Sequence, residues 1–375
     1  EKVTIEWNAT AAEKGEYRHF MQKEIFEQPT VVAQTLRSYI RQVDQSVALP
    51  QFDLDLSKIT RVTIVACGTS FYAGMVAKYW LEQFARLPVD IDVASEFRYR
   101  DPVLEPGGLA LFISQSGETA DTLAALRHCK DAGQTIAVVV NVPTSSMARE
   151  ADLLLPTHAG PEIGVASTKA FSCQLAVLAA FAAHMAVQRG RMDRAEETEV
   201  VKHLLETPAS LNAALSHDDE IAAMAHLIAP ARDVLYLGRG QDYPLALEGA
   251  LKLKEISYIH AEGYASGEMK HGPIALIDDE MPVVVLATKG GPYDKIISNI
   301  QEVKARKGRI VAIVSQGDKI IRDLAEFVIE IPETEEPLTP LLSVVPLQLL
   351  AYHIAVLRGC NVDQPRNLAK SVTVE

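Results

Sequence analysis

Short apolar runs alternate with longer helical stretches along most of this chain. Almost wholly apolar runs, such as residues 135–140, are typical of strands that are buried on both faces. Predicted strands cover residues 61–66, 91–94, 109–113, 135–140, 152–155, 233–237, 282–287, 309–314 and 327–331. An alternating strand–helix order predicts parallel sheets flanked by helices, an α/β fold of the doubly wound, flavodoxin-like kind.

The same plan occurs twice in the sequence. Three pairs of segments match at a nearly constant spacing of roughly 170 residues: 61–68 with 232–240, 109–114 with 282–287, and 151–156 with 325–332. We therefore predict a duplicated domain. The expected limits are a connector and helical lead-in over 1–49, a first domain over 50–195, a second domain over 196–360 and a C-terminal tail over 361–375.

Length and charge agree with this organisation and exclude some partners. A chain of 375 residues is too long for one ordinary hydrophobic core. The net charge of −13 argues against a nucleic-acid partner, which usually requires a basic surface. The most apolar stretch, residues 170–187, is interrupted by Gln174 and His184 and predicts a buried core helix. We expect no nucleic-acid partner and no membrane partner.

The cysteines indicate a reducing compartment. Cys67, Cys129, Cys173 and Cys360 form no CxxC pair and no Cys/His cluster with metal-ligand spacing. They predict reduced thiols in a cytoplasmic protein, and we expect no metal and no cofactor. The chain begins at Glu1 without an initiator Met, which suggests a fragment or a processed form.

A loop of hydroxyl and amide side chains joins the strand at 109–113 to a helix predicted over 120–132. Backbone N–H groups at a helix N-terminus lack partners within the helix, and the helix dipole adds positive charge there. The loop, residues 114–119, contains no Lys or Arg, so we expect neutral donors to hold a phosphate. A serine-rich turn that only caps the helix explains the composition equally well.

Residues after the neighbouring strand extend this candidate site. The carboxyl ends of parallel strands meet at one edge of a sheet, so Thr69 and Ser70, which follow the strand at 61–66, should lie beside the loop. Cys67 is nearby and is expected to fill space as a buried thiol. The second copy replaces these residues with 239–241 and 287–292, so we expect only the first copy to keep a hydroxyl-lined anion site.

The helix predicted after Pro244 carries ionisable residues on one face. Glu248, Lys252 and Glu255 are spaced by four and three residues, which places them on the same side of a helix. Spacing alone favours a solvated face with an ion pair. A proton-transfer site is the alternative interpretation, since a carboxylate serves as a general base when exclusion of water raises its pKa.

The motifs together resemble a known family. Residues 67–70, 114–119 and 164–169 resemble the sugar isomerase (SIS) domain family. The helix motif at 246–257 and the tail at 364–375 are similar to the C-terminal isomerase half of glutamine–fructose-6-phosphate aminotransferases. The resemblance covers nearly the whole chain. It implies two tandem SIS domains that convert fructose 6-phosphate and ammonia into glucosamine 6-phosphate.

The resemblance assigns roles to individual residues. Glu255 corresponds to the base that moves a proton between C1 and C2, and Lys252 to a residue that stabilises the intermediate. His271 corresponds to the histidine that opens the sugar ring, which comes from the neighbouring subunit and therefore requires a homodimer. Lys370 corresponds to the lysine that forms a Schiff base, which requires the neutral amine, on a tail that closes as a lid.

Binding residues are implied in the same way. The phosphate ligands would be Ser114, Gln115, Ser116 and Thr119, with help from Thr69 and Ser70; the sugar contacts would be Val165, Ser167 and the backbone of Ala369, with Cys67 and Glu162 beside them. Residues 1–30 look like a connector to an N-terminal glutaminase domain that is absent from this chain. Without it, we expect activity to be limited to sugar-phosphate isomerisation.

Two rival functions remain open at this point. An SIS-type sugar-phosphate isomerase or deaminase would share the fold and the phosphate site, but the tail at 366–370 argues against it. A sugar-phosphate sensor would bind without turnover. Such sensors usually pair one SIS domain with a basic DNA-binding domain, which two copies and a negative net charge do not match.

Overall fold

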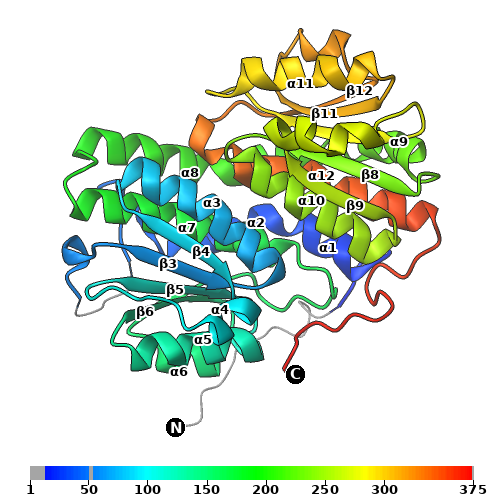
Figure 1. The fold of residues 1–375 in the computed structure, drawn as a ribbon. Coiled ribbons are helices and arrows are strands. Elements are labelled where there is room, and N and C mark those ends of the chain that lie inside the picture. Colours follow the sequence, from blue (N-terminus) through cyan, green and yellow to red (C-terminus); the bar gives the residue numbers. More distant parts are fainter. Residues whose placement is uncertain (1–12, 50–53, 374–375) are drawn as a thin grey trace.

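Two parallel sheets form the framework of the molecule. The computed structural model describes residues 13–49 and 54–373, and Figure 1 shows the two halves side by side. The first sheet contains β3 (Val62–Ala66), β4 (Val89–Val93), β5 (Leu109–Ser114), β6 (Thr135–Val140) and β7 (Leu153–Pro156), in the order β4-β3-β5-β6-β7. The second contains β8 (Asp233–Gly238), β9 (His260–Ala265), β10 (Pro282–Ala287), β11 (Arg309–Ser315) and β12 (Phe327–Ile331), in the order β12-β11-β10-β8-β9.

Both sheets have the same topology. In each one the second strand pairs on one side of the first and the third strand pairs on the other, which is the flavodoxin-like order. All neighbouring strands within the two sheets are parallel. The predicted α/β fold with two doubly wound domains is therefore confirmed. The expected domain limits stay predictions; of the residues in them, 1–12, 50–53 and 374–375 lie outside the described residues.

The apolar runs located most of the strands, but sequence analysis missed β9 and a small hairpin. The segment His260–Ala265 is polar and lies at the edge of its sheet, paired only with β8. Its sequence therefore lacks the apolar run of a central strand. The hairpin of β1 (Ile40–Arg41) and β2 (Ser46–Val47) is antiparallel and too short to give a periodic signal.

Helices cover both faces of each sheet. In the first half they are α3 (Gly68–Phe84), α4 (Ala94–Arg100), α5 (Ala120–Asp131), α6 (Ser146–Glu150) and α7 (Lys169–Gln188). In the second half they are α9 (Asp218–Ile228), α10 (Asp242–Ser257), α11 (Tyr293–Ala305) and α12 (Thr339–Leu357), with short 3-10 helices η3 (Ser266–His271), η4 (Pro273–Leu276), η5 (Ile321–Asp323) and η6 (Glu336–Leu338). The lead-in forms α1 (Phe20–Phe26) and α2 (Gln28–Arg37), followed by η2 (Leu56–Lys58).

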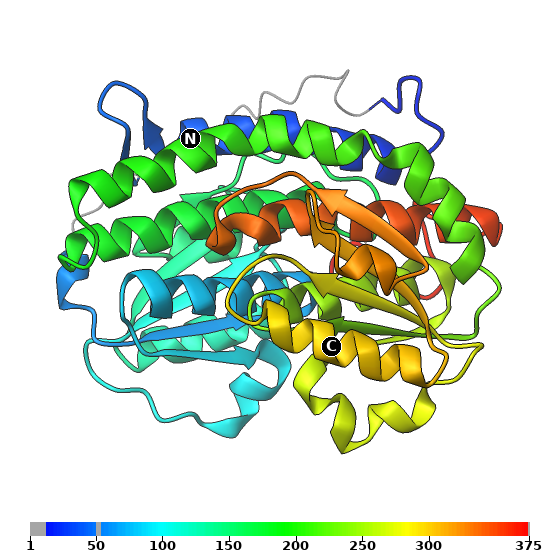
Figure 2. The same cartoon turned by 90° about the horizontal axis from the view of Figure 1, so that it is seen from above.

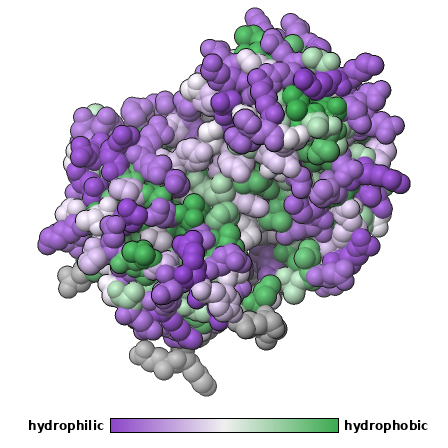
Figure 3. All heavy atoms as spheres, in the orientation of Figure 1, coloured by the Kyte–Doolittle hydropathy of each residue, from purple (hydrophilic) through white to green (hydrophobic). Residues whose placement is uncertain are grey.

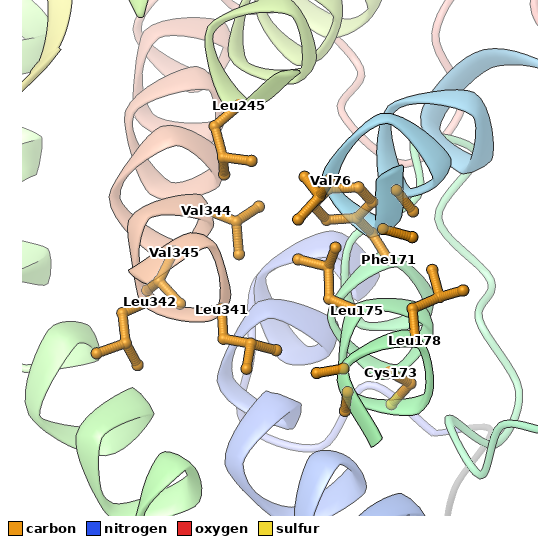
Figure 4. Packing of buried hydrophobic residues seen from close by; sticks show 14 of the residues in the cluster. Val76, Phe171, Cys173, Leu175, Leu178, Leu245, Leu341, Leu342, Val344 and Val345 are labelled. Carbon is orange, nitrogen blue, oxygen red and sulfur yellow. The ribbon is translucent and has the colours of Figure 1, made fainter. Parts of the chain in front are cut away.

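A shared core joins the two halves. Helix α3 packs on α7, α10 packs on α12, and α3 also contacts α10. Figure 4 shows Val76 of α3 and Phe171 of α7 facing the same apolar interior as Leu245 of α10 and Leu341 of α12. These side chains are fully buried. Because the interior is continuous, the ends of α3 and α10 are held in fixed positions relative to each other.

One long helix spans the two halves. Helix α8 (Arg194–Leu215) begins with a capping box, in which the Asp193 side chain accepts hydrogen bonds from the N–H groups of Ala195 and Glu196, and the Glu196 side chain accepts one from the Asp193 N–H. It contacts α2, α7 and α12. Figure 2 shows it running along one side of the molecule across both domains.

Two helices are long and apolar enough to cross a membrane, but both lie inside the protein. They are Lys169–Gln188 and Glu336–Leu357, in which 89% and 83% of the most apolar window is buried. The predicted core helix at 170–187 is thus confirmed. Hydrophilic residues cover most of the face in Figure 3, with hydrophobic residues gathered where the two halves meet.

Candidate active site

A cavity of about 210 Å³ lies at the carboxyl ends of β3 and β5. The strand order of the first sheet reverses between these two strands, which is where open α/β sheets bind ligands. Loops from the first domain, helix α10 of the second domain and the C-terminal tail all reach it. The predicted residues that line it are Cys67, Thr69, Ser70, Ser114, Gln115, Ser116, Thr119, Val165, Ser167, Lys252, Glu255, Ala369 and Lys370.

The hydroxyl loop has a conformation that only glycine allows at its centre. Gly117 has a φ of +67°, and a Cβ there would collide with Ser145. The Oγ of Ser114 accepts a hydrogen bond from the Gly117 N–H at 2.9 Å, and the Oγ of Ser116 accepts one from the Glu118 N–H at 3.2 Å. These bonds fix the curl of the loop, with Ser114, Gln115, Ser116 and Thr119 bordering the cavity.

The C-terminal tail crosses this loop at the start of α5. The Ala120 N–H donates to the carbonyl of Val372 at 3.2 Å, and the Oγ atoms of Ser116 and Ser371 are 3.2 Å apart. The tail therefore occupies part of the anion-binding helix terminus and covers the cavity. Leu368, Ser371 and Val372 also line the cavity, and the sequence gave no local signal for them.

The ionisable face of α10 is buried, so its interpretation as a solvated face is wrong. The side chains of Lys252 and Glu248 are 1% and 0% exposed. The Nζ of Lys252 lies 2.6 Å from Oε2 of Glu255, 3.5 Å from Oε1 of Glu248 and 3.0 Å from Oγ1 of Thr69. Helix α10 thereby delivers one cation and two carboxylates to the edge of the first domain.

The electrostatics of this cluster fix the charge on the lysine. Burial acts to lower the pKa of Lys252, but the charges of Glu248 and Glu255 outweigh it and hold that pKa above its usual range. Burial raises the pKa of Glu248 to about 7, although Lys252 acts to lower it. Oε2 of Glu248 has no hydrogen-bond partner among the described residues. Lys252 is therefore a fixed cation, and the deeply buried carboxylate is Glu248 rather than the partly exposed Glu255.

Lys370 is held by a buried carboxylate. Its Nζ lies 2.6 Å from Oε2 of Glu162 and 2.7 Å from the carbonyl oxygen of Gly164. Burial acts to raise the pKa of Glu162, but Lys370 and the N–H groups of Thr168 and Ala170 outweigh it and hold that pKa below its usual range. This position stabilises the ammonium form, so the amine must lose its proton before it can attack a carbonyl.

A residue of the lead-in supports the same loop, and sequence analysis missed it. The carboxylate of Glu24, in α1, is 2% exposed and accepts hydrogen bonds from Ile163 N–H at 2.5 Å and Gly164 N–H at 3.3 Å. Burial raises the pKa of Glu24 to about 7, with a further increase from the charge of Glu162. An isolated acidic residue on a short helix carries no sequence signal for such a contact.

The remaining candidates differ in their surroundings. Burial raises the pKa of the Cys67 thiol, which fits a space-filling residue. Glu162 contacts Ser167 as well as Lys370. His271 lies at the end of η3, exposed, and does not line the cavity. Across residues 13–49 and 54–373, no group of His, Cys, Asp and Glu side chains is arranged to hold a metal ion.

A family model for the SIS domain matches residues 55–184 and 227–358. The chain belongs to the SIS domain family. The two matches coincide with the two sheets, so the SIS fold is present twice. The switch-point cavity lies in the first SIS domain, and α10, which completes it, belongs to the second.

Known relatives of this SIS chain carry a more specific name. It is 68% identical over 364 residues to glutamine–fructose-6-phosphate aminotransferase (isomerizing) of Zymomonas mobilis, covering 97% of this chain and 60% of the relative. The chain thus spans about 60% of the length of the curated relatives it matches. The solved C-terminal domain of glucosamine-fructose-6-phosphate aminotransferase from Francisella tularensis has a TM-score of 0.89 and 43% identity, covering 94% of this chain and 100% of that one.

A solved deaminase is more distant. The structure of glucosamine-6-phosphate deaminase from Thermotoga maritima has a TM-score of 0.74 and 24% identity, covering 94% of this chain and 99% of that one. At this identity the likeness extends to the fold alone.

Proposed function

We propose that this chain is the isomerase half of a glutamine–fructose-6-phosphate aminotransferase, which converts fructose 6-phosphate and ammonia into glucosamine 6-phosphate. The observation that carries the proposal is that one cavity gathers a neutral phosphate cradle, a buried Lys–Glu pair and a lysine from the C-terminal tail. The names of the relatives at 68% and 57% identity support it.

The phosphate is held without a cationic side chain in the hydroxyl loop. Ser114, Gln115, Ser116 and Thr119 surround the cavity at the end of β5, and Thr69 and Ser70 face them from the start of α3. Hydroxyl and amide donors give a phosphate several hydrogen bonds, each stronger for being made to a charged group. This arrangement binds the 6-phosphate and leaves C1 and C2 of the sugar toward α10 and the tail.

Imine formation begins with a proton transfer between two residues already in contact. Glu162 takes a proton from the Lys370 ammonium, from which its Oε2 is 2.6 Å away. The neutral amine then attacks C2 of the open-chain sugar, and water leaves as the imine forms. Ammonia displaces the lysine from this imine, which returns Lys370 and leaves nitrogen on C2. Val165, Ser167 and the backbone of Ala369 hold the sugar hydroxyls.

Isomerisation uses the pair on α10. Glu255 removes the proton from C1 and returns it to C2, which turns the C2 imine into the amine and C1 into the aldehyde. Lys252, a fixed cation within 2.6 Å of Glu255, stabilises the negative charge that develops on the intermediate. Glu248 and Thr69 hold that cation in place from the other side.

Ring opening requires a second copy of the chain. His271 is exposed on η3 and lies outside the cavity of its own chain, which supports its delivery to the site of a partner protomer in a homodimer. A histidine exchanges protons near neutral pH, as opening of the hemiketal demands. The full-length protein would add an N-terminal glutaminase domain as the ammonia source. We place the enzyme in the cytoplasm, with sugar phosphates as ligands and neither nucleic acid nor membrane as a partner.

The proposal is tested by incubating the chain with fructose 6-phosphate, with and without ammonium. We expect glucose 6-phosphate, and glucosamine 6-phosphate when ammonium is present, with both products lost in Glu255→Gln. Glu199→Gln, an exposed carboxylate on α8, is the matched control. Release of ammonia from glucosamine 6-phosphate without its synthesis would identify a deaminase instead. Saturable binding without any turnover would identify a sensor.

A further inference from the structure

The second domain has a cavity at the place that corresponds to the candidate active site of the first. Its sheet reverses strand order between β8 and β10, as the first sheet does between β3 and β5. A cavity of about 120 Å³ lies just beyond the carboxyl ends of β8 and β10. Open α/β sheets bind ligands in this crevice, so the duplication created two such positions in one chain.

The two positions carry different chemistry. Where the first domain has serine and threonine hydroxyls, the second has Arg239 directly after β8 and Lys289 shortly after β10, both lining the cavity. Their described hydrogen bonds go to neutral groups. Arg239 Nη1 donates to Oδ1 of Asn299 at 3.3 Å, and Lys289 Nζ donates to the carbonyl of Gln316 at 3.4 Å. Two cations thus border the crevice without a carboxylate in those bonds.

A buried carboxylate in the same cavity lacks one partner. Asp242, in the first turn of α10, is 4% exposed, and its Oδ2 accepts a hydrogen bond from Oγ1 of Thr288 at 2.7 Å. Its Oδ1 has no hydrogen-bond partner among the described residues. Leaving a buried acceptor unpaired costs about 1–3 kcal/mol. Burial raises the pKa of Asp242 to about 6, so the group is an acceptor at neutral pH.

We propose that the crevice bounded by Arg239, Asp242 and Lys289 binds a small phosphate monoester that carries a hydroxyl or ammonium group. The two cations meet the phosphate, where Arg offers a planar pair of donors and Lys a point charge. Oδ1 of Asp242 accepts the hydrogen bond of the hydroxyl or ammonium group. The cavity has little more than half the volume of the first site, which limits the ligand to about three carbons.

Calorimetric titration with glycerol 3-phosphate tests this site. The compound is not a ketose, so the result is independent of the proposed function. The titration uses Ser116→Ala to weaken the first-domain site. We expect saturable binding that Arg239→Gln and Lys289→Gln each weaken about tenfold or more, the loss of one charged hydrogen bond. Sulfate, which lacks a hydrogen to donate to Asp242, should bind at least about tenfold more weakly than glycerol 3-phosphate.

The controls separate a binding site from general charge effects. Lys289 is exposed, so its glutamine variant should keep the fold. Lys295→Gln changes an exposed lysine on α11 that does not line the cavity and should leave binding unchanged. The proposal is overturned if glycerol 3-phosphate does not saturate, or if Arg239→Gln and Lys289→Gln bind it as well as Lys295→Gln does. Either result would mean that only water satisfies Asp242.

Discussion

The amine of Lys370 lies 2.6 Å from Oε2 of Glu162, a carboxylate that is fully buried beneath it. The two residues are 208 positions apart in the sequence. Glu162 is itself held by the N–H groups of Thr168 at 2.9 Å and Ala170 at 3.0 Å, so its position does not depend on the tail. The contact therefore fixes where the tail stops and which group can take the proton from Lys370.

Replacing the lysine separates binding from chemistry. We expect Lys370→Ala to lose turnover of fructose 6-phosphate while its affinity for the sugar phosphate changes little, because the phosphate cradle belongs to other residues. Lys254→Ala, an exposed lysine on α10, should retain full activity. Steady-state kinetics and equilibrium binding measure the two effects. Full turnover by Lys370→Ala would exclude the Schiff-base role.

Removal of one hydroxyl from the cradle should act on binding. Ser116→Ala deletes an Oγ that lines the cavity and accepts from Glu118 N–H. A hydrogen bond to a charged phosphate contributes about 1.5–3 kcal/mol, so we expect the affinity for fructose 6-phosphate to fall roughly tenfold to a hundredfold. Ser298→Ala, on the exposed side of α11, is the control. An unchanged dissociation constant for Ser116→Ala would remove this residue from the phosphate site.

Mixing two inactive variants tests the shared histidine. If His271 serves the partner's cavity, a heterodimer of His271→Ala and Lys370→Ala contains one intact site. Random exchange in an equal mixture then gives about a quarter of the wild-type activity. If His271 acted within its own chain, every site would carry one substitution and the mixture would stay inactive. The measurement is turnover of fructose 6-phosphate after the protomers have exchanged.

The buried Glu24 should make stability fall as the pH rises. Its pKa is about 7 in the folded protein and about 4.5 when exposed, so the folded state binds the proton more tightly. This contribution to stability is complete below about pH 4.5 and is lost as the pH rises through 7. Glu24→Gln should therefore lose a few degrees less in melting temperature between pH 5 and pH 8 than the unsubstituted chain.

The control for this effect is Glu13→Gln, an exposed carboxylate that precedes α1. It should follow the unsubstituted chain at every pH. The glutamine at position 24 can still accept a hydrogen bond from Ile163 N–H, so the comparison isolates the charge. Parallel melting curves for Glu24→Gln and the unsubstituted chain between pH 5 and pH 8 would show that Glu24 is ionised throughout.

Local patterns in the sequence determined the framework of the fold and the position of the phosphate loop. Apolar runs placed the central strands because a strand buried on both faces must be apolar along its length. The spacing of Glu248, Lys252 and Glu255 placed them on one face because the helical repeat is local. Recognition of residues 114–119 likewise needed only the strand, loop and helix that adjoin them.

Tertiary structure decided what those faces and loops meet. The burial of Lys252 and Glu248, the polar edge strand β9 and the contacts of Glu24 and Glu162 all depend on segments far apart in the sequence. A pKa of about 7 for Glu24 or Glu248 exists only once packing has removed water from the carboxylate. Periodicity carries no information on which distant segment covers a residue, because that depends on the packing of the whole chain.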